Sequence, residues 1–461
     1  MTGPRQFGTA AAFALLCTVV LDACSDPAKS PLSPVDAVAL FAKSTSVSVK
    51  ATDPSFGDQG QTNETVTITG SGFKSGARAA WLRNGAVDPT ITVSSTQVVN
   101  STTLTAVISI APNSPVDFRD VQVTNFDRTQ GIGASVFEVT QAHIIAGTSA
   151  ARAANDNGEA TGSLATGGTF YYNISSGLLQ TVSTAAGTGY AISPTGNAIA
   201  GGDLNGASRP YLYTRSGPVG TGWSVTTLPV DPKANGGAAT AIGTDPVTGQ
   251  VTLLGGLETY AQSGNCAGSN AIIWSWQAST GTWQRTVLPK NGACQAAIRP
   301  RGLSANGTAV GTAGGTAAVW TPNGSGGYTL TLLDASYANG IDAGASMIVG
   351  EMNVTHSTAA AVYWVASGGG WGHATQFAGG CSSSRDIADV SGRVTLNNCP
   401  FPGTSVTYAS YMDAPYASPI RLGGVGGHNN NFVGGISPSG RYLVGNGVTS
   451  GSVQVGVYWA P

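Results

Sequence analysis

Residues 191–196 read AISPTG and residues 435–440 read GISPSG. Each stretch joins a small residue to an aliphatic one and then passes through a turn that ends in glycine, the residue that best accepts a positive φ. A short apolar strand follows each turn, and an aromatic strand comes later, reading YLY at 211–213 and VYW at 457–459. These two stretches therefore define a unit built from short strands.

The same unit recurs from about residue 142 to the end of the chain. Further turn copies occupy 153–158 and 302–307, and looser ones include residues 241–242, 340–341 and 386–387. Each copy has an aromatic strand, and the remaining five of these lie at 170–172, 273–276, 319–320, 362–364 and 408–411. Seven copies at spacings of about 40 to 58 residues, with four short strands each, predict an all-β fold with a seven-bladed β-propeller at 141–461. A β-helix or an irregular β-sandwich is the alternative.

The two ends of the repeat region complement each other. The last copy stops at Trp459, directly after its aromatic third strand, whereas residues 141–148 precede the first copy and belong to no copy. A closed ring leaves no unpaired sheet edge. We therefore predict that residues 141–148 supply the outer strand of the last blade.

The repeat resembles the HAF family of extracellular repeats, in which an aliphatic-Asn-Gly turn leads to a strand ending in glycine and then to an aromatic strand. Residues 303–307, reading LSANG, carry the turn of that pattern. The resemblance implies an extracellular or envelope protein. The sequence has neither the Kelch nor the WD40 signature, so the partners of those families are not expected.

Upstream of the repeats, residues 45–140 alternate apolar and polar side chains in short runs. Examples are VTIT at 66–69, LTAVI at 104–108 and VQVT at 121–124. Alternation with period two marks half-buried strands, and roughly seven of them in this length predict a two-sheet sandwich.

The stretch TITGSGF at 67–73, followed by STTLTA at 101–106 and DVQVTN at 120–125, resembles the IPT/TIG family of immunoglobulin-like domains. That resemblance implies a spacer or interaction module with no catalytic residues to carry over. Gly70 and Gly72 allow a tight bend at which Phe73 turns into the core.

The N-terminus has the layout of a secretory signal: Arg5 precedes an apolar stretch at 7–21. The residues just before Cys24 resemble a lipoprotein signal box, which implies cleavage after residue 23 and a lipid on Cys24. Residues 24–44 contain several prolines and suit a flexible tether. We expect an exported lipoprotein of the outer membrane or cell surface, facing the periplasm or the exterior. An ordinary signal peptide with a chance cysteine is the alternative.

Four cysteines remain in the repeat region, and an even count in an exported chain predicts two disulfides. Three pairings are possible. Sequence proximity and the expected blade geometry both favour Cys266 with Cys294 and Cys381 with Cys399, with both bridges on one face of the propeller.

The longest loops between predicted strands fall on that same face, at 257–270, 289–300 and 400–407. Binding residues tend to lie on loops carried by a rigid scaffold. The predicted binding face therefore contains aromatic and basic residues in or next to these loops, Tyr260, Lys290, Arg299, Arg301 and Phe401. Solvated loops held by disulfides are the alternative interpretation.

Composition and motifs weigh against several classes of function. The net charge is -2 and charged residues make up 10% of the chain, which is unlike a nucleic-acid binder. The four histidines have no metal-ligand spacing, and neither His-Glu-x-x-His nor Gly-x-Ser-x-Gly occurs, so we expect no metal, no cofactor and no catalytic residues. Several aspartates suit turns, and the recurring aromatic residues suit packing between blades.

We therefore expect a monomeric, non-enzymatic binding or adhesion protein, attached to a membrane through its lipid and binding an extracellular glycan or protein through the propeller. Two alternatives stay open. One is a polysaccharide hydrolase or lyase using paired carboxylates near the channel, and the other is a purely structural envelope component.

Overall fold

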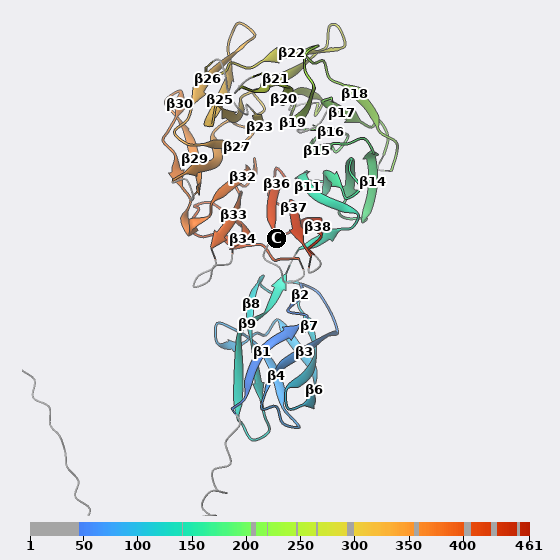
Figure 1. The fold of residues 1–461 in the computed structure, drawn as a ribbon, viewed down its shortest axis with the longest axis vertical. Helices are drawn as coiled ribbons and strands as arrows, with labels where there is room; N and C mark the ends of the chain where they lie inside the picture. Colours follow the sequence, from blue (N-terminus) through green and yellow to red (C-terminus); the bar gives the residue numbers. More distant parts are fainter. Residues whose placement is uncertain are drawn as a thin grey trace, which may run out of the picture. The chain divides into compact units, whose positions relative to one another are not determined.

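The computed structural model describes residues 46–140, 142–203, 209–218, 220–245, 248–263, 266–292, 299–354, 359–400, 407–425, 431–449 and 452–461. Almost all of the regular elements are strands (Figure 1). The predicted signal peptide, Cys24 and the tether lie outside the described residues. None of the helices in the described ranges has the length and hydropathy needed to cross a membrane.

Residues 46–140 form two sheets that share one core. The first sheet contains, in spatial order, β1 (Ser48–Asp53), β3 (Glu64–Ser71), β7 (Thr103–Ile110) and β6 (Ile91–Asn100). The second contains β2 (Phe56–Asp58), β9 (Gln130–Thr140), β8 (Asp117–Thr124), β4 (Arg78–Arg83) and β5 (Ala86–Val87). Inward-facing residues of both sheets, such as Ile68, Trp81, Leu104 and Phe137, pack together. The predicted two-sheet sandwich is confirmed.

The bend after β3 forms as the sequence predicts. Phe73 is only 3% exposed and belongs to the sandwich core. A Cβ at Gly70 would collide with the backbone oxygen of Ser48 and with the Phe73 ring, and Gly72 has a φ of 76°. Glycine at both positions therefore lets the chain turn Phe73 inward.

The described parts of residues 142–461 form seven antiparallel blades around a common centre (Figure 1). Blade 1 contains β11 (Thr148–Ala154), β12 (Glu159–Leu164), β13 (Thr169–Asn173) and β14 (Leu178–Ser183). Blade 2 contains β15 (Thr188–Ile192), β16 (Ala198–Asp203), β17 (Tyr211–Thr214) and β18 (Ser224–Thr227). Blade 3 contains β19 (Gly236–Thr244), β20 (Val251–Ser263), β21 (Cys266–Gln277) and β22 (Thr282–Val287). Blades 2 and 3 also join where β16 pairs with β19.

The remaining blades follow the same plan. Blade 4 contains β23 (Arg299–Leu303), β24 (Ala309–Ala313), β25 (Thr316–Pro322) and β26 (Tyr328–Leu332). Blade 5 contains β27 (Tyr337–Ile341), β28 (Met347–Asn353) and β29 (Ala359–Ser367), with β30 (Gly370–Trp371) and β31 (Thr375–Gln376) both paired to β29. After a 3-10 turn at Ala378–Gly380, blade 6 contains β32 (Ser383–Ile387), β33 (Val394–Pro400), β34 (Thr407–Met412) and β35 (Ile420–Arg421). Blade 7 contains β36 (Phe432–Ile436), β37 (Leu443–Val448), β38 (Gln454–Trp459) and β10 (His143–Ile145).

The ring is closed by β10, the strand that precedes blade 1. It pairs antiparallel with β38, with His143 opposite Tyr458 and Ile145 opposite Gly456. The rings of His143 and Tyr458 also stack, with centroids 4.7 Å apart. The predicted closing strand is therefore confirmed.

The recurring tryptophans hold neighbouring blades together, as predicted. Trp274, Trp320, Trp364 and Trp459 are fully buried in third strands. Each packs against residues of the preceding blade. Each indole N–H donates a hydrogen bond to the connection that leads into its own blade, namely to Pro229, Pro289, Asp334 and Gly423.

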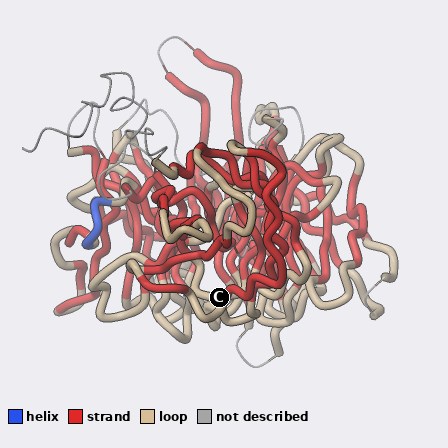
Figure 2. The backbone as a smooth tube through the Cα atoms, turned by 90° about the horizontal axis from the view of Figure 1, so that it is seen from below, coloured by secondary structure: helices blue, strands red, loops and turns tan. Residues whose placement is uncertain are grey.

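Blade 3 differs from the loop predicted at 257–270. These residues continue β20 and β21, which remain paired out to Ser263 and Cys266. Figure 2 shows the resulting hairpin extending beyond the neighbouring strands. The prediction of a loop was wrong because the apolar run that marks the blade stops earlier than the backbone pairing does.

The disulfide predicted between Cys381 and Cys399 is present. It links the approach to β32 with the end of β33. Cys294 and the side chain of Cys266 lie outside the described residues, so their pairing stays a prediction.

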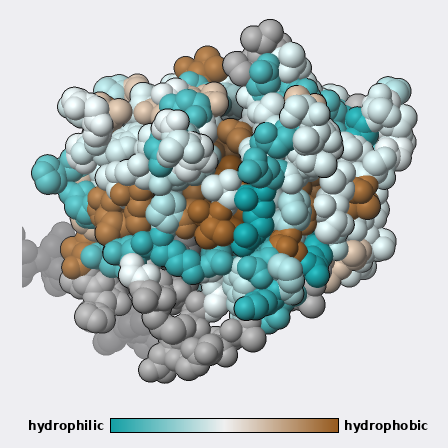
Figure 3. All heavy atoms as spheres, turned by 90° about the horizontal axis from the view of Figure 1, so that it is seen from above, coloured by the Kyte–Doolittle hydropathy of each residue, from teal (hydrophilic) through white to brown (hydrophobic). Residues whose placement is uncertain are grey.

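The outer rims of the blades are mixed in polarity. Most fourth strands expose one aliphatic side chain among polar ones, as at Leu178, Val225, Val287, Leu332 and Ile420. The face in Figure 3 likewise shows hydrophobic side chains gathered between hydrophilic ones. Single exposed aliphatic residues are common on soluble proteins and need no partner.

Candidate functional site

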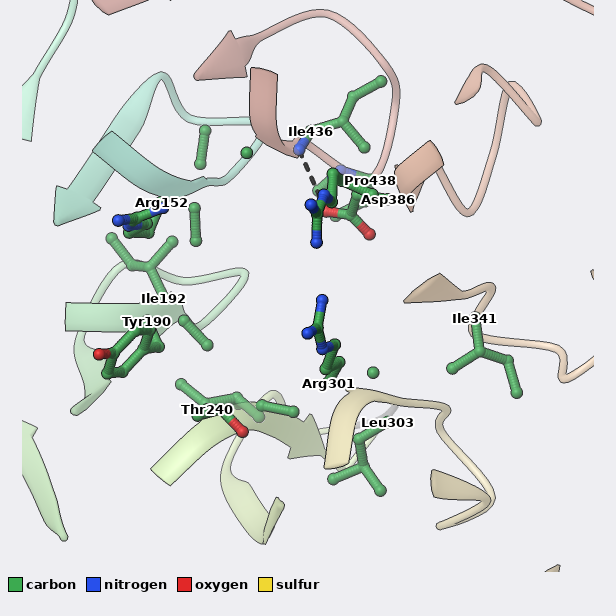
Figure 4. A pocket seen from close by; sticks show the side chains of 18 of the residues that line it. Arg152, Tyr190, Ile192, Thr240, Arg301, Leu303, Ile341, Asp386, Ile436 and Pro438 are labelled. Carbon is green, nitrogen blue, oxygen red and sulfur yellow. Dashed lines mark hydrogen bonds between the residues drawn. The ribbon is translucent and has the colours of Figure 1, made fainter. Parts of the chain in front are cut away.

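A cavity of about 760 Å³ lies around the centre of the propeller. Its lining comes from the first strand of every blade, β11, β15, β19, β23, β27, β32 and β36, from the turns that follow them, and from Asp203 at the end of β16. Figure 4 shows Arg301 extending toward the middle of this cavity, with Asp386 across from it. Because all seven blades contribute, the cavity is a product of ring closure.

A β-bulge in each first strand supplies lining residues. In blade 1, Ala151 pairs with Gly162 and Ala153 with Thr161, so Arg152 between them has no cross-strand partner. The other six first strands also contain residues without a cross-strand partner at the equivalent place. These residues are Tyr190, Thr240, Arg301, Asn339, Arg385 with Asp386, and Gly434. All of these residues line the cavity. Bulges commonly re-aim a side chain next to a functional site.

The repeat pattern explains the position of the bulge. The residue without a cross-strand partner lies directly before the small and aliphatic pair that defines each copy, as Tyr190 precedes Ala191 and Ile192. Facing the bulge, the second strand carries a glycine in several blades. A Cβ at Gly162, Gly256, Gly350 or Gly445 would collide with a backbone oxygen of the first strand. The close approach at the bulge therefore requires these glycines.

Three of the lining residues are arginines, from blades 1, 4 and 6. Arg301 donates from Nη1 to Oδ1 of Asn339 at 2.7 Å, and its guanidinium lies 5.7 Å from the Tyr337 ring centroid. The Arg385 guanidinium lies 4.9 Å from the ring centroid of Phe432. Burial lowers the pKa of Arg385.

Arg152 and Arg385 differ from the arginines that stabilise the fold. Within the described residues, neither forms an ion pair, and the buried Nε of each has no hydrogen-bond partner. By contrast, Arg119 pairs with Asp88, Arg215 with Glu159 and Arg285 with Glu258. A partly buried guanidinium without an anion is costly. The cavity therefore presents two guanidinium groups that form no ion pair among the described residues, in a lining that also contains Asp203, Asp386 and Asp389. The charge of Glu351 also acts on Arg385.

Asp386 is one of three aspartates that line the cavity, with Asp203 and Asp389, and it directly follows Arg385 in the sequence. Its Oδ1 accepts a hydrogen bond from the backbone N–H of Ile387, and its Oδ2 accepts one from Ile436. Burial nevertheless raises the pKa of Asp386 to about 7, and the charge of Asp389 adds to the rise. The charge in the cavity therefore changes near neutral pH.

Two other carboxylates connect neighbouring blades, whereas the turn interpretation predicted bonds within their own turns. Asp389 accepts a hydrogen bond from the backbone N–H of Ala343 in blade 5, at 2.7 Å. Asp156 in blade 1 accepts from the backbone N–H of Ser439 in blade 7, at 2.9 Å. In the ranges that the structure describes, no group of three or more His, Cys, Asp and Glu side chains could hold a metal ion.

The structure describes the predicted binding face only in part. Arg301 lines the central cavity from β23 instead of lying on a loop. The Tyr260 hydroxyl donates to Glu258, and Lys290 is exposed. Phe401 and the side chain of Arg299 lie outside the described residues. Sequence reasoning missed Arg152, Tyr190, Asn339 and Arg385, although their place before each small and aliphatic pair was a usable signal.

Comparisons with known proteins reveal no family. No protein-family model matches the chain, and no curated protein matches it. Similar solved structures include a chain of the mitotic checkpoint complex, at 11% identity and a TM-score of 0.45, covering 69% of this chain and 90% of that one. The propeller domain of the Trilobed protease from Pyrococcus furiosus has 10% identity and a TM-score of 0.37, over 75% and 92% of the two chains. TolB from Acinetobacter baumannii has 11% identity and a TM-score of 0.30, over 75% and 77%. With TM-scores below 0.5, these likenesses indicate nothing about the role of this chain.

Proposed function

We propose that this chain is an exported, non-enzymatic binding protein that holds an anionic ligand in the cavity of its propeller. The observation that carries the proposal is the pair Arg152 and Arg385, which line a cavity of about 760 Å³ without a carboxylate partner among the described residues. An anion placed between them would form charge-assisted hydrogen bonds, which are stronger than neutral ones.

The remaining features of the proposal come from the sequence. Cys24 would carry the lipid, residues 24–44 would act as the tether, and the sandwich would be an IPT/TIG-like stalk below a propeller of HAF-type repeats. The disulfide between Cys381 and Cys399 supports an oxidising compartment, because such bonds are rare in the cytosol. The chain would be monomeric and would bind its ligand outside the cytoplasm.

The carboxylate geometry favours binding over hydrolysis. A glycosidase needs two carboxylates that are free to act on either side of a glycosidic bond. Both oxygens of Asp386 accept backbone N–H groups, and Asp389 connects two blades. These roles hold the ring together, which is a structural task.

Removal of the two free arginines tests the proposal. We expect Arg152→Met and Arg385→Met each to weaken binding of a sulfated disaccharide by about ten- to a hundredfold, because a charged contact in a partly buried site is lost. Isothermal titration with the full chain measures the affinity, and the unsulfated parent sugar is the reference ligand. Arg441→Met is the matched control, since Arg441 is exposed and lies outside the cavity. Equal affinity of the wild type for the sulfated and unsulfated sugars would refute the proposal.

The affinity for that anion is also expected to depend on pH. Asp386 has a pKa of about 7, so it is mostly neutral at pH 6 and mostly ionised at pH 8. The added negative charge should weaken binding of the sulfated disaccharide about three- to tenfold between these values, because it repels the ligand. Sulfate itself does not titrate in this range. Asp386→Asn should give a flat profile, and a profile that keeps its slope in this variant contradicts the assignment.

A further inference from the structure

A second cavity, of about 350 Å³, lies between blades 2 and 3, away from the central one. Its lining comes from β16, β17 and β18 of blade 2, from the start of β20 and from β21 and β22 of blade 3. The turn at 193–197 contributes Pro194 to the central cavity and Asn197 to this groove. The groove therefore lies beside the same turn, on the outer side of the ring.

Two tryptophans of the groove do not belong to the set that packs the blades. Trp276 and Trp283 face each other across β21 and β22, with ring centroids 5.5 Å apart and planes inclined at 59°. Both are only partly buried, whereas the recurring tryptophan of the same blade, Trp274, is fully buried. Neither indole N–H has a hydrogen-bond partner in the described parts of the chain. These rings offer an apolar surface with open donors at its edge.

Free polar groups surround the tryptophan pair. The side chains of Thr214, Thr226 and Gln250 form no hydrogen bond within the described ranges. Asn197 accepts through Oδ1 from the hydroxyls of Ser193 and Thr195, which leaves its side-chain amide N–H groups to donate. The groove thus combines neutral donors and acceptors with aromatic faces.

The one charged residue that lines the groove is already neutralised. Nη2 of Arg215 pairs with Oε1 of Glu159 at 2.8 Å. Nη1 of the same guanidinium is buried without a hydrogen-bond partner in the structure as described. The guanidinium charge is therefore compensated and its Nη1 is shielded from the groove, so the polar groups that the groove presents to a ligand are neutral.

We propose that this groove binds one ring of a neutral saccharide. The C–H face of a pyranose would stack on Trp276 or Trp283, and its hydroxyls would exchange hydrogen bonds with Asn197, Thr226 and Gln250. A hydroxylated ring suits this chemistry better than an apolar ligand, which would leave those polar groups unpaired. The proposal is independent of the anion site, because the groove shares no lining residue with the central cavity.

Titration of the full chain with cellotriose and maltotriose tests the groove, with tryptophan fluorescence as the readout. We expect saturable quenching for at least one of these glucose trisaccharides. Trp283→Ala should weaken that binding at least tenfold, and Gln250→Ala about three- to tenfold. Gln250 is exposed, so its substitution leaves packing intact and separates loss of binding from loss of folding. Gln284→Ala is the matched control, because Gln284 is exposed on β22 and does not line the groove.

Three outcomes would overturn the proposal: no binding of either trisaccharide to the wild type, unchanged affinity in both Trp283→Ala and Gln250→Ala, or an equal loss in Gln284→Ala. Failure of the sulfated disaccharide to bind would refute the anion site alone. The two titrations use different ligands and different variants, so each proposal fails separately.

Discussion

Substitution of methionine for Arg215 is expected to lower the free energy of unfolding of the propeller by about 3–5 kcal/mol. Arg215 and Glu159 form an ion pair of 2.8 Å between blades 2 and 1, and their side chains are only 4% and 5% exposed. Glu159 also accepts hydrogen bonds from the Tyr171 hydroxyl and from the side-chain amide of Asn155. Removal of the guanidinium leaves a buried carboxylate without its countercharge, and that uncompensated charge is the source of the loss.

Chemical denaturation followed by tryptophan fluorescence measures this loss, since eight of the nine tryptophans lie in the repeat region. Arg441→Met is the control and should change stability by less than about 0.5 kcal/mol, because Arg441 is exposed. The double variant Glu159→Leu with Arg215→Met should lose less free energy of unfolding than Arg215→Met alone, since no buried charge stays unpaired. A single variant that loses under 1 kcal/mol would show that the ion pair does not stabilise the ring.

The fold could be predicted because its signals repeat. Each blade needs a turn, a short apolar strand and an aromatic strand, so the same residues recur and reinforce one another. The closing strand was predictable for a related reason. The last copy lacks a fourth strand, residues 141–148 have no blade of their own, and a closed ring satisfies both. The buried Trp274 and Trp320 follow from the aromatic strand alone.

The central site was not predicted because a repeat is recognised by what its copies share. The side chains that line the cavity are those that differ between copies, as Arg152, Thr240 and Asn339 do at equivalent bulges. The long loops instead predicted a binding site on the face that carries the disulfides. A bulge breaks the in–out alternation of its strand, as the burial pattern of β11 shows, so alternation with period two does not place the side chains at the bulge.

Truncation of Ile145 to alanine is expected to lower the free energy of unfolding by about 2–5 kcal/mol. Ile145 is fully buried in β10, where it packs with residues of blade 1 such as Leu164 and Phe170 and with Val444 of blade 7. The substitution removes buried aliphatic volume from the strand that closes the ring. Because β10 has only three residues, the lost packing also weakens its pairing with β38.

Ile144→Ala is the matched control, because Ile144 lies next to Ile145 in the same strand and is 47% exposed. Ile144→Ala should lower the free energy of unfolding by less than about 1 kcal/mol and leave the melting temperature almost unchanged. Hydrogen exchange separates closure from general packing: amides of β38 should exchange faster in Ile145→Ala, while those of blade 4, far from the closure, keep their protection. Equal, small losses in the two variants would mean that β10 pairs with blade 7 without stabilising it, and that the ring is held closed by contacts between the other blades.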